Sequence, residues 1–203
     1  MNWDSSLNNY YKYISIERNL SKNSIESYMR DVKQFSSFNA STKPAEIKKI
    51  HIINYINHIN KNQISASTQA RILSSIRSFF DFLIYDNQLQ QDPCKHIKTP
   101  KIGKKMPIVL SVEEIDKIIN SIDLSQTNGE RNRAIIECLY SCGLRVSELI
   151  NLKISNILIT EKIIKVIGKG NQQRIVPLNK TLEKYFQYYI KHIRSKQKID
   201  KKY

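Results

Sequence analysis

The chain has few cysteines, and they are not arranged to bind zinc. Cys94, Cys138 and Cys142 are the only three among 203 residues, an odd number without the short paired spacing of a structural zinc site. Cys138 and Cys142 lie four residues apart and would share one face of a helix. We therefore expect buried, reduced thiols rather than a disulfide framework or a metal centre.

Long apolar runs are also missing. No stretch approaches the roughly 20 apolar residues that span a bilayer, and the opening residues MNWDSSLNNYY lack the basic and apolar segments of a signal peptide. We expect no membrane partner and a cytoplasmic location. A GxxxxGK[ST] phosphate-binding loop is not found at the one Gly-Lys-Gly turn, residues 168–170, so that turn is not of the Walker type.

Acidic residues are scarce relative to basic ones. There are 18 Asp and Glu against 33 Lys and Arg, a formal charge of +15. Residues 1–105 carry 16 basic and 8 acidic side chains, and residues 106–203 carry 17 and 10. Both halves are therefore basic, which favours a polyanionic partner such as nucleic acid. The richness in Lys, Asn and Ile is also compatible with a compositional bias of the genome.

The first half has the apolar spacing of a helical bundle. Residues 5–17, a segment beginning near Asn23, a segment around 52–59, and residues 66–85 each repeat apolar side chains every three or four positions. Asn23 and Glu26 have the spacing of a capping box, which predicts the start of the second helix there. Arg71 and Arg77 lie outside the middle of the fourth apolar stripe. The sequence predicts a mainly α protein with an N-terminal four-helix domain over residues 1–91.

Residues 92–107, DPCKHIKTPKIGKKMP, have the composition of a linker. The segment contains three prolines and Gly103, and its basic residues are Lys95, Lys98, Lys101, Lys104 and Lys105. Such a connector is often lysine-rich for solubility alone. A basic linker between two basic domains is also what a clamp around DNA requires.

The second half, residues 108–203, changes from helical to β periodicity and back. Ser111 and Glu114 form a second capping-box pattern, and another helix is expected over about 130–141. Short β-rich runs follow at 157–159, 163–167 and 174–176, the last two separated by the glycine-containing turn 168–171. Helical spacing returns from Leu182. We expect an α+β domain with a small antiparallel sheet.

Two segments carry candidate chemistry. In Cys142-Gly143-Leu144-Arg145-Val146-Ser147-Glu148-Leu149, a glycine ends one helix and an arginine precedes the next, presenting a planar fork suited to two phosphate oxygens. Glu148 could hold that guanidinium, although a plain surface Arg–Glu pair is the simpler interpretation. In Ile167-Gly168-Lys169-Gly170-Asn171-Gln172-Gln173-Arg174, Lys169 could donate a proton or merely lie on a solvated turn.

Together and in this order, the two segments resemble the signature of tyrosine recombinases, especially Xer-type enzymes and phage integrases. RNLSKNSIESYMRDVKQF and STQARILSSIRSFFDFL resemble parts of that family's N-terminal core-binding (SAM-like) domain, and MPIVLSVEEID resembles the entry to its catalytic domain. The resemblance covers effectively the whole chain. It implies site-specific DNA recombination through a phosphotyrosyl intermediate, without a cofactor, a metal or a small-molecule substrate.

The resemblance also assigns expected roles. Arg145 matches the first of two catalytic arginines, Lys169 matches the hairpin lysine that protonates the leaving oxygen, and Glu148 matches a supporting position. Double-stranded DNA and further recombinase protomers are the expected partners. The expected DNA contacts are Arg71, Arg77, Lys101, Lys104, Lys105 and Arg174.

The family's His-x-x-Arg motif and its nucleophilic tyrosine have no counterpart in these residues, since His192-Ile193-Arg194 has the wrong spacing. We therefore expect a C-terminally truncated catalytic domain that is inactive alone. A DNA-binding regulator without chemistry is the alternative, and an unrelated basic helical protein is a third hypothesis. The sequence leaves open the choice between chromosome-dimer resolution and mobile-element integration.

Overall fold

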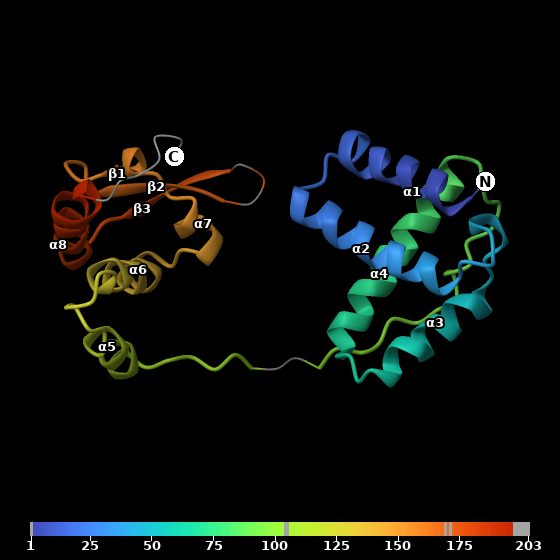
Figure 1. Cartoon of the computed structure of the whole chain (residues 1–203), viewed down its shortest axis with the longest axis horizontal. Coiled ribbons are helices and arrows are strands. Elements are labelled where there is room, and N and C mark those ends of the chain that lie inside the picture. The colour runs from blue at the N-terminus through green and yellow to red at the C-terminus, as the bar shows by residue number, and fades with distance from the viewer. Residues whose placement is uncertain (1, 104–105, 169, 171, 197–203) are drawn as a thin grey trace. The chain divides into compact units, whose positions relative to one another are not determined.

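A computed structural model describes residues 2–103, 106–168, 170 and 172–196. The chain forms two compact units, Met1–Met106 and Pro107–Tyr203 (Figure 1). Of the predicted linker, residues 92–106 belong to the first unit and Pro107 to the second.

The first unit is helical, as its apolar spacing predicts. Helix α1 (Trp3–Lys12) continues into a π-helical turn (Tyr13–Glu17), and α2 (Lys22–Phe38), α3 (Lys49–Lys61) and α4 (Ala66–Tyr85) follow, with a 3-10 turn at Pro44–Glu46. The predicted capping box at Asn23 and Glu26 is wrong, because the N-cap is Ser21 and Asn23 lies inside α2. The first helical hydrogen bond already closes there, from Ile25 N to Ser21 O at 3.0 Å.

Aromatic side chains fill the core of the first unit. Tyr10, Phe35, Phe79 and Phe80 are fully buried, and Trp3 stacks on Phe79 with ring centroids 5.7 Å apart. Tyr10 donates its hydroxyl to Ser78 Oγ at 2.9 Å, and burial raises the pKa of Tyr10 above its usual range. Helix α4 packs against α2, behind which it runs in Figure 1. This packing brings residues 40 positions apart in the chain, such as Asp31 and Arg71, into contact.

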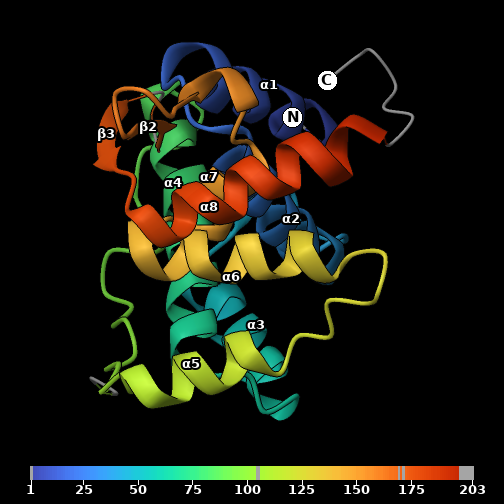
Figure 2. The ribbon, with the colours of Figure 1, turned by 90° about the vertical axis from the view of Figure 1, so that its left-hand side faces the viewer.

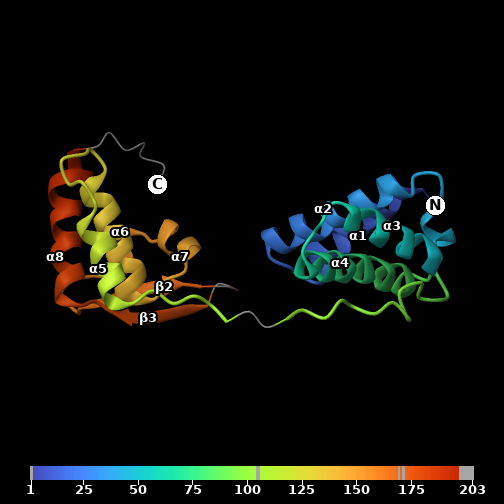
Figure 3. The same ribbon diagram turned by 90° about the horizontal axis from the view of Figure 1, so that it is seen from below.

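The second unit combines helices with the predicted small sheet. Its helices are α5 (Val112–Asn120), α6 (Gly129–Cys142), α7 (Val146–Ile150) and α8 (Lys180–Tyr188); α8 continues into helical turns over Tyr189–Ile193 and Arg194–Lys196. The strands β1 (Ile157–Leu158), β2 (Ile163–Ile167) and β3 (Gln173–Pro177) form an antiparallel sheet in the order β1-β2-β3. Figures 2 and 3 show α5, α6 and α8 side by side.

The core of the second unit lies between α6, α8 and the inner face of the sheet. Ile164 and Val166 of β2 and Leu182 of α8 are buried there, together with Cys138. All three cysteines are buried free thiols, and burial raises the pKa of Cys94 to about 12. The predicted capping box of α5 is confirmed: Glu114 N donates to Ser111 Oγ at 3.2 Å, and Ser111 N donates to Glu114 Oε2 at 2.7 Å.

None of the helices within the described ranges has both the length and the apolar character needed to cross a membrane.

Candidate functional site

The turn between α6 and α7 positions Arg145. Helix α6 ends at Gly143, whose φ of +56° lies in the left-handed region that glycine adopts at least cost. Leu144 is buried in the core and anchors the turn. Arg145 is then the N-cap of α7, in extended conformation. The local sequence therefore fixes the backbone of Arg145 between a glycine stop and a helix start.

Glu148 is the centre of the site. Its side chain is only 3% exposed, and its two carboxylate oxygens accept four hydrogen bonds. Arg145 donates its backbone N–H to Oε2 at 2.8 Å and its Nη1 to Oε1 at 2.9 Å. Arg174 of β3 donates Nη1 to Oε1 at 2.6 Å and Nη2 to Oε2 at 2.9 Å. We call Arg145, Glu148 and Arg174 the Glu148 cluster.

These contacts keep Glu148 ionised. The paired guanidinium of Arg174, followed by the backbone N–H of Arg145, lowers the pKa of Glu148 to about 2. The same pairing raises the pKa of Arg174 above its usual value. The cluster therefore carries one anion and two cations, a net charge of +1 at neutral pH. This net positive charge attracts anions.

Arg145 and Arg174 differ in which of their N–H donors Glu148 leaves free to bind a ligand. The side chain of Arg145 is 71% exposed, and within the described part of the chain its Nε and Nη2 make no hydrogen bond. Arg174 is 39% exposed, and Glu148 takes both of its Nη groups. Arg145 can thus offer one edge of its fork to a phosphate. The geometry of Arg174 suits holding Glu148, and its predicted contact with DNA stays a prediction.

The β2–β3 hairpin reaches the cluster through Gly168. Gly168 N donates to Gln172 O at 2.7 Å and closes the hairpin. A Cβ at Gly168 would lie 3.3 Å from Glu148 Oε1, so a larger residue would crowd the carboxylate. Lys169, the predicted proton donor, lies outside the described residues. Gly168, its neighbour in the chain, lies beside the carboxylate that Arg145 and Arg174 share.

A second carboxylate cluster lies in the first unit, between α2 and α4. The side chain of Asp31 is 1% exposed; its Oδ2 accepts from Arg71 Nη1 and, at 2.8 Å, from Ser75 Oγ. Arg71 Nη1 also donates to Ser27 Oγ at 3.0 Å. Arg30 Nε lies 3.8 Å from Asp31 Oδ1. We call Arg30, Asp31 and Arg71 the Asp31 cluster.

Arg77, another predicted DNA contact, belongs to neither cluster. Arg77 donates Nη1 to Thr99 Oγ1 at 2.8 Å and Nη2 to the carbonyl of Ile97, so it ties the segment after α4 to that helix. Lys101 is exposed, and Lys104 and Lys105 lie outside the described residues.

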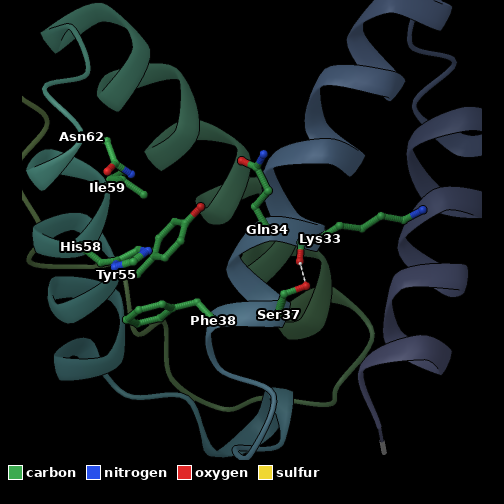
Figure 4. A pocket seen from close by; sticks show the side chains of 8 residues that line it. All are labelled: Lys33, Gln34, Ser37, Phe38, Tyr55, His58, Ile59 and Asn62. Carbon is green, nitrogen blue, oxygen red and sulfur yellow. Dashed lines mark hydrogen bonds between the residues drawn. The ribbon is translucent and has the colours of Figure 1, made fainter.

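A further hollow of about 570 Å³ lies between α2 and α3 (Figure 4). Figure 4 shows Phe38 of α2 facing Tyr55 and His58 of α3, with Lys33 directed away from them. Phe38 and His58 have ring centroids 4.8 Å apart. This aromatic lining does not match the phosphate chemistry that the two clusters suggest.

Comparison with known proteins gives the family. The family model "Phage integrase, N-terminal SAM-like domain" matches residues 7–87, and the model "Phage integrase family" matches residues 109–203. Tyrosine recombinase XerD of Staphylococcus haemolyticus is 38% identical over 195 residues, which cover 95% of this chain and 66% of the relative. The chain belongs to the Xer-type tyrosine recombinases of the phage integrase family. This confirms the family resemblance on which the sequence-based roles depend.

Other relatives of this recombinase chain agree. Tyrosine recombinase XerD of Listeria monocytogenes serotype 4b is 34% identical over 94% of this chain and 65% of the relative. The chain thus spans about two thirds of the length of these relatives.

Solved structures share the fold. A lambda integrase dimer bound to a COC′ core site has a TM-score of 0.75 at 19% identity, covering 95% of this chain and 70% of that one. The XerH recombinase bound to a palindromic difH substrate has a TM-score of 0.68 at 21% identity, covering 96% of this chain and 60% of that one. At these identities the likeness concerns the fold.

Sequence reasoning missed two partners at these sites. Arg174 was assigned to DNA rather than to Glu148, which is 26 positions away in the chain and belongs to α7 rather than to the hairpin. Asp31 received no role, because its burial depends on Arg71 and Ser75 of another helix. The sequence signals Asp31 only as a charged residue within the apolar pattern of a helix.

Proposed function

We propose that this chain binds duplex DNA and supplies part of the active site for strand cleavage and rejoining. The Glu148 cluster carries this proposal: one buried carboxylate orients two guanidiniums from different elements and leaves one edge of Arg145 open. Such preorganised donors stabilise charge that develops on a phosphoryl group. Both halves of the chain are basic, which agrees with a partner that presents many phosphates.

In the proposed reaction a tyrosine oxygen attacks the scissile phosphorus, and the bond from phosphorus to the 5′ oxygen breaks. Arg145 contacts the non-bridging oxygens, while Lys169 gives a proton to the departing 5′ oxygen. Rejoining is the reverse: a 5′-hydroxyl attacks the phosphotyrosine and releases the tyrosine. We expect the nucleophilic tyrosine and the His-x-x-Arg motif outside these 203 residues.

Glu148 and Arg174 act in this scheme as positioning residues. Glu148 holds Arg145 in place through two hydrogen bonds. The bidentate pair with Arg174 holds Glu148 in turn. The whole recombinase would work on DNA in the cytoplasm, assembled with further protomers. Among the solved structures with this fold, a lambda integrase dimer is bound to a COC′ core site and XerH is bound to a palindromic difH substrate.

Salt dependence tests DNA binding. If about six phosphates are neutralised, the slope of log affinity against log salt concentration should be near −5. A gel-shift titration of the 203-residue chain at several salt concentrations measures this slope. Absence of binding at low salt, or affinity indifferent to salt, would refute the proposal.

A further inference from the structure

The buried carboxylate of Asp31 has no part in the proposed chemistry. Oδ2 accepts from Arg71 and Ser75, whereas Oδ1 makes no hydrogen bond with any described residue. Burying a charge with one unsatisfied oxygen costs stability. Stability alone therefore explains this residue poorly, and the orientation of its arginine partner is a better explanation.

Among the described residues, the hydrogen bonds of the Arg71 guanidinium involve Nη1 alone. Its Nη1 donates to both Ser27 Oγ and Asp31 Oδ2, which uses both hydrogens of that nitrogen. Nε and Nη2 have no hydrogen-bond partner among the described residues, and the side chain is 41% exposed. The guanidinium plane is thus fixed by groups from α2, with its opposite edge open to solvent.

Arg71 lines a hollow of about 270 Å³ at the surface of the first unit. The hollow is lined by Ser24, Ser27, Tyr28, Arg71, Ser74 and Ser75, five of which carry a hydroxyl group. An arginine edge with two donors matches two acceptors at once, either O6 and N7 of a guanine or two oxygens of a phosphate. Hydroxyl groups beside it add donors of the kind that contact DNA backbones.

We propose that Asp31 is a positioning residue for DNA recognition, which holds Arg71 so that its Nε–Nη2 edge contacts duplex DNA. This inference rests on the proposed DNA-binding function. Charge alone predicts the opposite of positioning: removing the negative charge of Asp31 would strengthen binding to a polyanion. Positioning predicts weaker binding, because the fork of Arg71 loses its orientation. The sign of the change therefore decides between them.

The test measures gel-shift affinity for two probes. One is the duplex that the wild-type chain selects from a random-sequence pool, and the other is a scrambled duplex of equal composition. Arg71→Ala should weaken binding to the selected duplex roughly tenfold, as for loss of one bidentate contact. Asp31→Asn should weaken it roughly threefold, since the asparagine keeps the shape but not the charge-assisted bond.

A double-mutant cycle separates positioning from any independent effect. With Arg71→Ala already present, adding Asp31→Asn should cause no further loss of affinity. Glu26→Gln is the matched control, because it removes the same charge from an exposed position of α2. It should leave affinity unchanged or slightly higher. A loss confined to the selected duplex indicates a base contact, and equal losses on both duplexes indicate a phosphate; both support positioning.

Wild-type or higher affinity of Asp31→Asn would overturn the inference, and so would an additive double mutant. If thermal melts show that Asp31→Asn does not fold, Arg71→Lys decides instead. Lysine keeps the charge of arginine but not its planar fork. The loss of DNA affinity in Arg71→Lys should therefore approach that in Arg71→Ala, and unchanged affinity would contradict positioning. Failure of the wild-type chain to bind either duplex would instead refute the proposed function itself.

Discussion

Each unit has a buried carboxylate that contacts two arginines, Asp31 in the first unit and Glu148 in the second, but the hydrogen bonds of the two carboxylates differ. Glu148 accepts four hydrogen bonds, shared between both of its oxygens. Asp31 accepts its hydrogen bonds on Oδ2 alone, and Arg30 approaches Oδ1 only to 3.8 Å. One cluster joins a helix start to a strand, and the other joins two long helices.

The difference indicates how tightly each arginine must be held. A contact made in a transition state is stronger when its donors need no rearrangement. Glu148 gives Arg145 such support, because it accepts hydrogen bonds from both the side chain and the backbone N–H of Arg145. A contact with DNA in the ground state tolerates more freedom, because it is one among many. We therefore assign chemistry to the Glu148 cluster and DNA contact to the Asp31 cluster.

The largest expected effect tests this division directly. In a full-length protein that continues these residues with the rest of the catalytic domain, Arg145→Ala should lower covalent adduct formation on a nicked suicide substrate by about 10²–10³. Lys169→Ala should do the same. Arg174→Lys, which keeps the charge but not the bidentate pair, should lower covalent adduct formation about tenfold.

All three variants should keep most of their DNA affinity, whereas Arg71→Ala should lose affinity and form normal amounts of adduct at saturating DNA. Lys184→Ala, an exposed cation of α8, is the control for charge. If Arg71→Ala and Arg145→Ala gave the same pattern of losses, the two clusters would not have separate tasks.

An intermediate effect concerns acid stability. The pKa of Glu148 is about 2 in the folded chain against a usual 4.5, so its contribution to stability is complete above about pH 4.5 and is lost as the pH falls toward 2. Glu148→Gln lacks this contribution at every pH. From pH 5 to pH 3 the wild-type melting temperature should therefore fall further than that of Glu148→Gln.

Thermal melts followed by circular dichroism measure this difference, and carboxylates common to both proteins cancel. Glu161→Gln, at an exposed position, should fall as the wild type does. Parallel melting curves for wild type and Glu148→Gln across this range would show that the cluster does not hold Glu148 ionised.

The smallest effect separates Arg77 from Arg71, which sequence patterning treats alike. Both Nη groups of Arg77 bind the segment at Ile97 and Thr99, so Arg77→Ala should destabilise the chain by about 1 kcal/mol in a urea titration. Any loss of DNA affinity should be equal on selected and scrambled duplexes. Lys98→Ala should leave stability unchanged, and a loss of sequence preference in Arg77→Ala would show instead that Arg77 contacts bases.

Local patterns predicted most of the fold. The broad apolar stripe of residues 66–85 matches α4, and glycines between β-branched runs predicted the β2–β3 hairpin. The π-helical continuation of α1 at Tyr13–Glu17 was not distinguishable from ordinary helix, because both use similar apolar spacing. The start of α2 was misplaced by two residues, since a capping pattern identifies residue types rather than the closing hydrogen bond.

The site was predicted only where its residues are close in sequence. Arg145 and Glu148 lie three positions apart, so their contact follows from helix geometry. The pairs Arg174–Glu148 and Arg71–Asp31 connect separate elements. Their formation depends on strand pairing and helix packing, which a periodicity of apolar residues does not specify.

The pairing of β3 with β2 places a further demand on the chain. Val166 lies opposite Arg174, and Ile164 lies opposite Val176, so Arg174 shares a face with a core residue. Successive strand residues point to opposite faces, and a slip of one position reverses them all. One residue added to or deleted from β3 between Arg174 and Pro177 would turn Arg174 away from Glu148. Replacing the exposed Ile175 leaves that alignment intact, so natural variation of this strand should proceed by substitution and not by change of length.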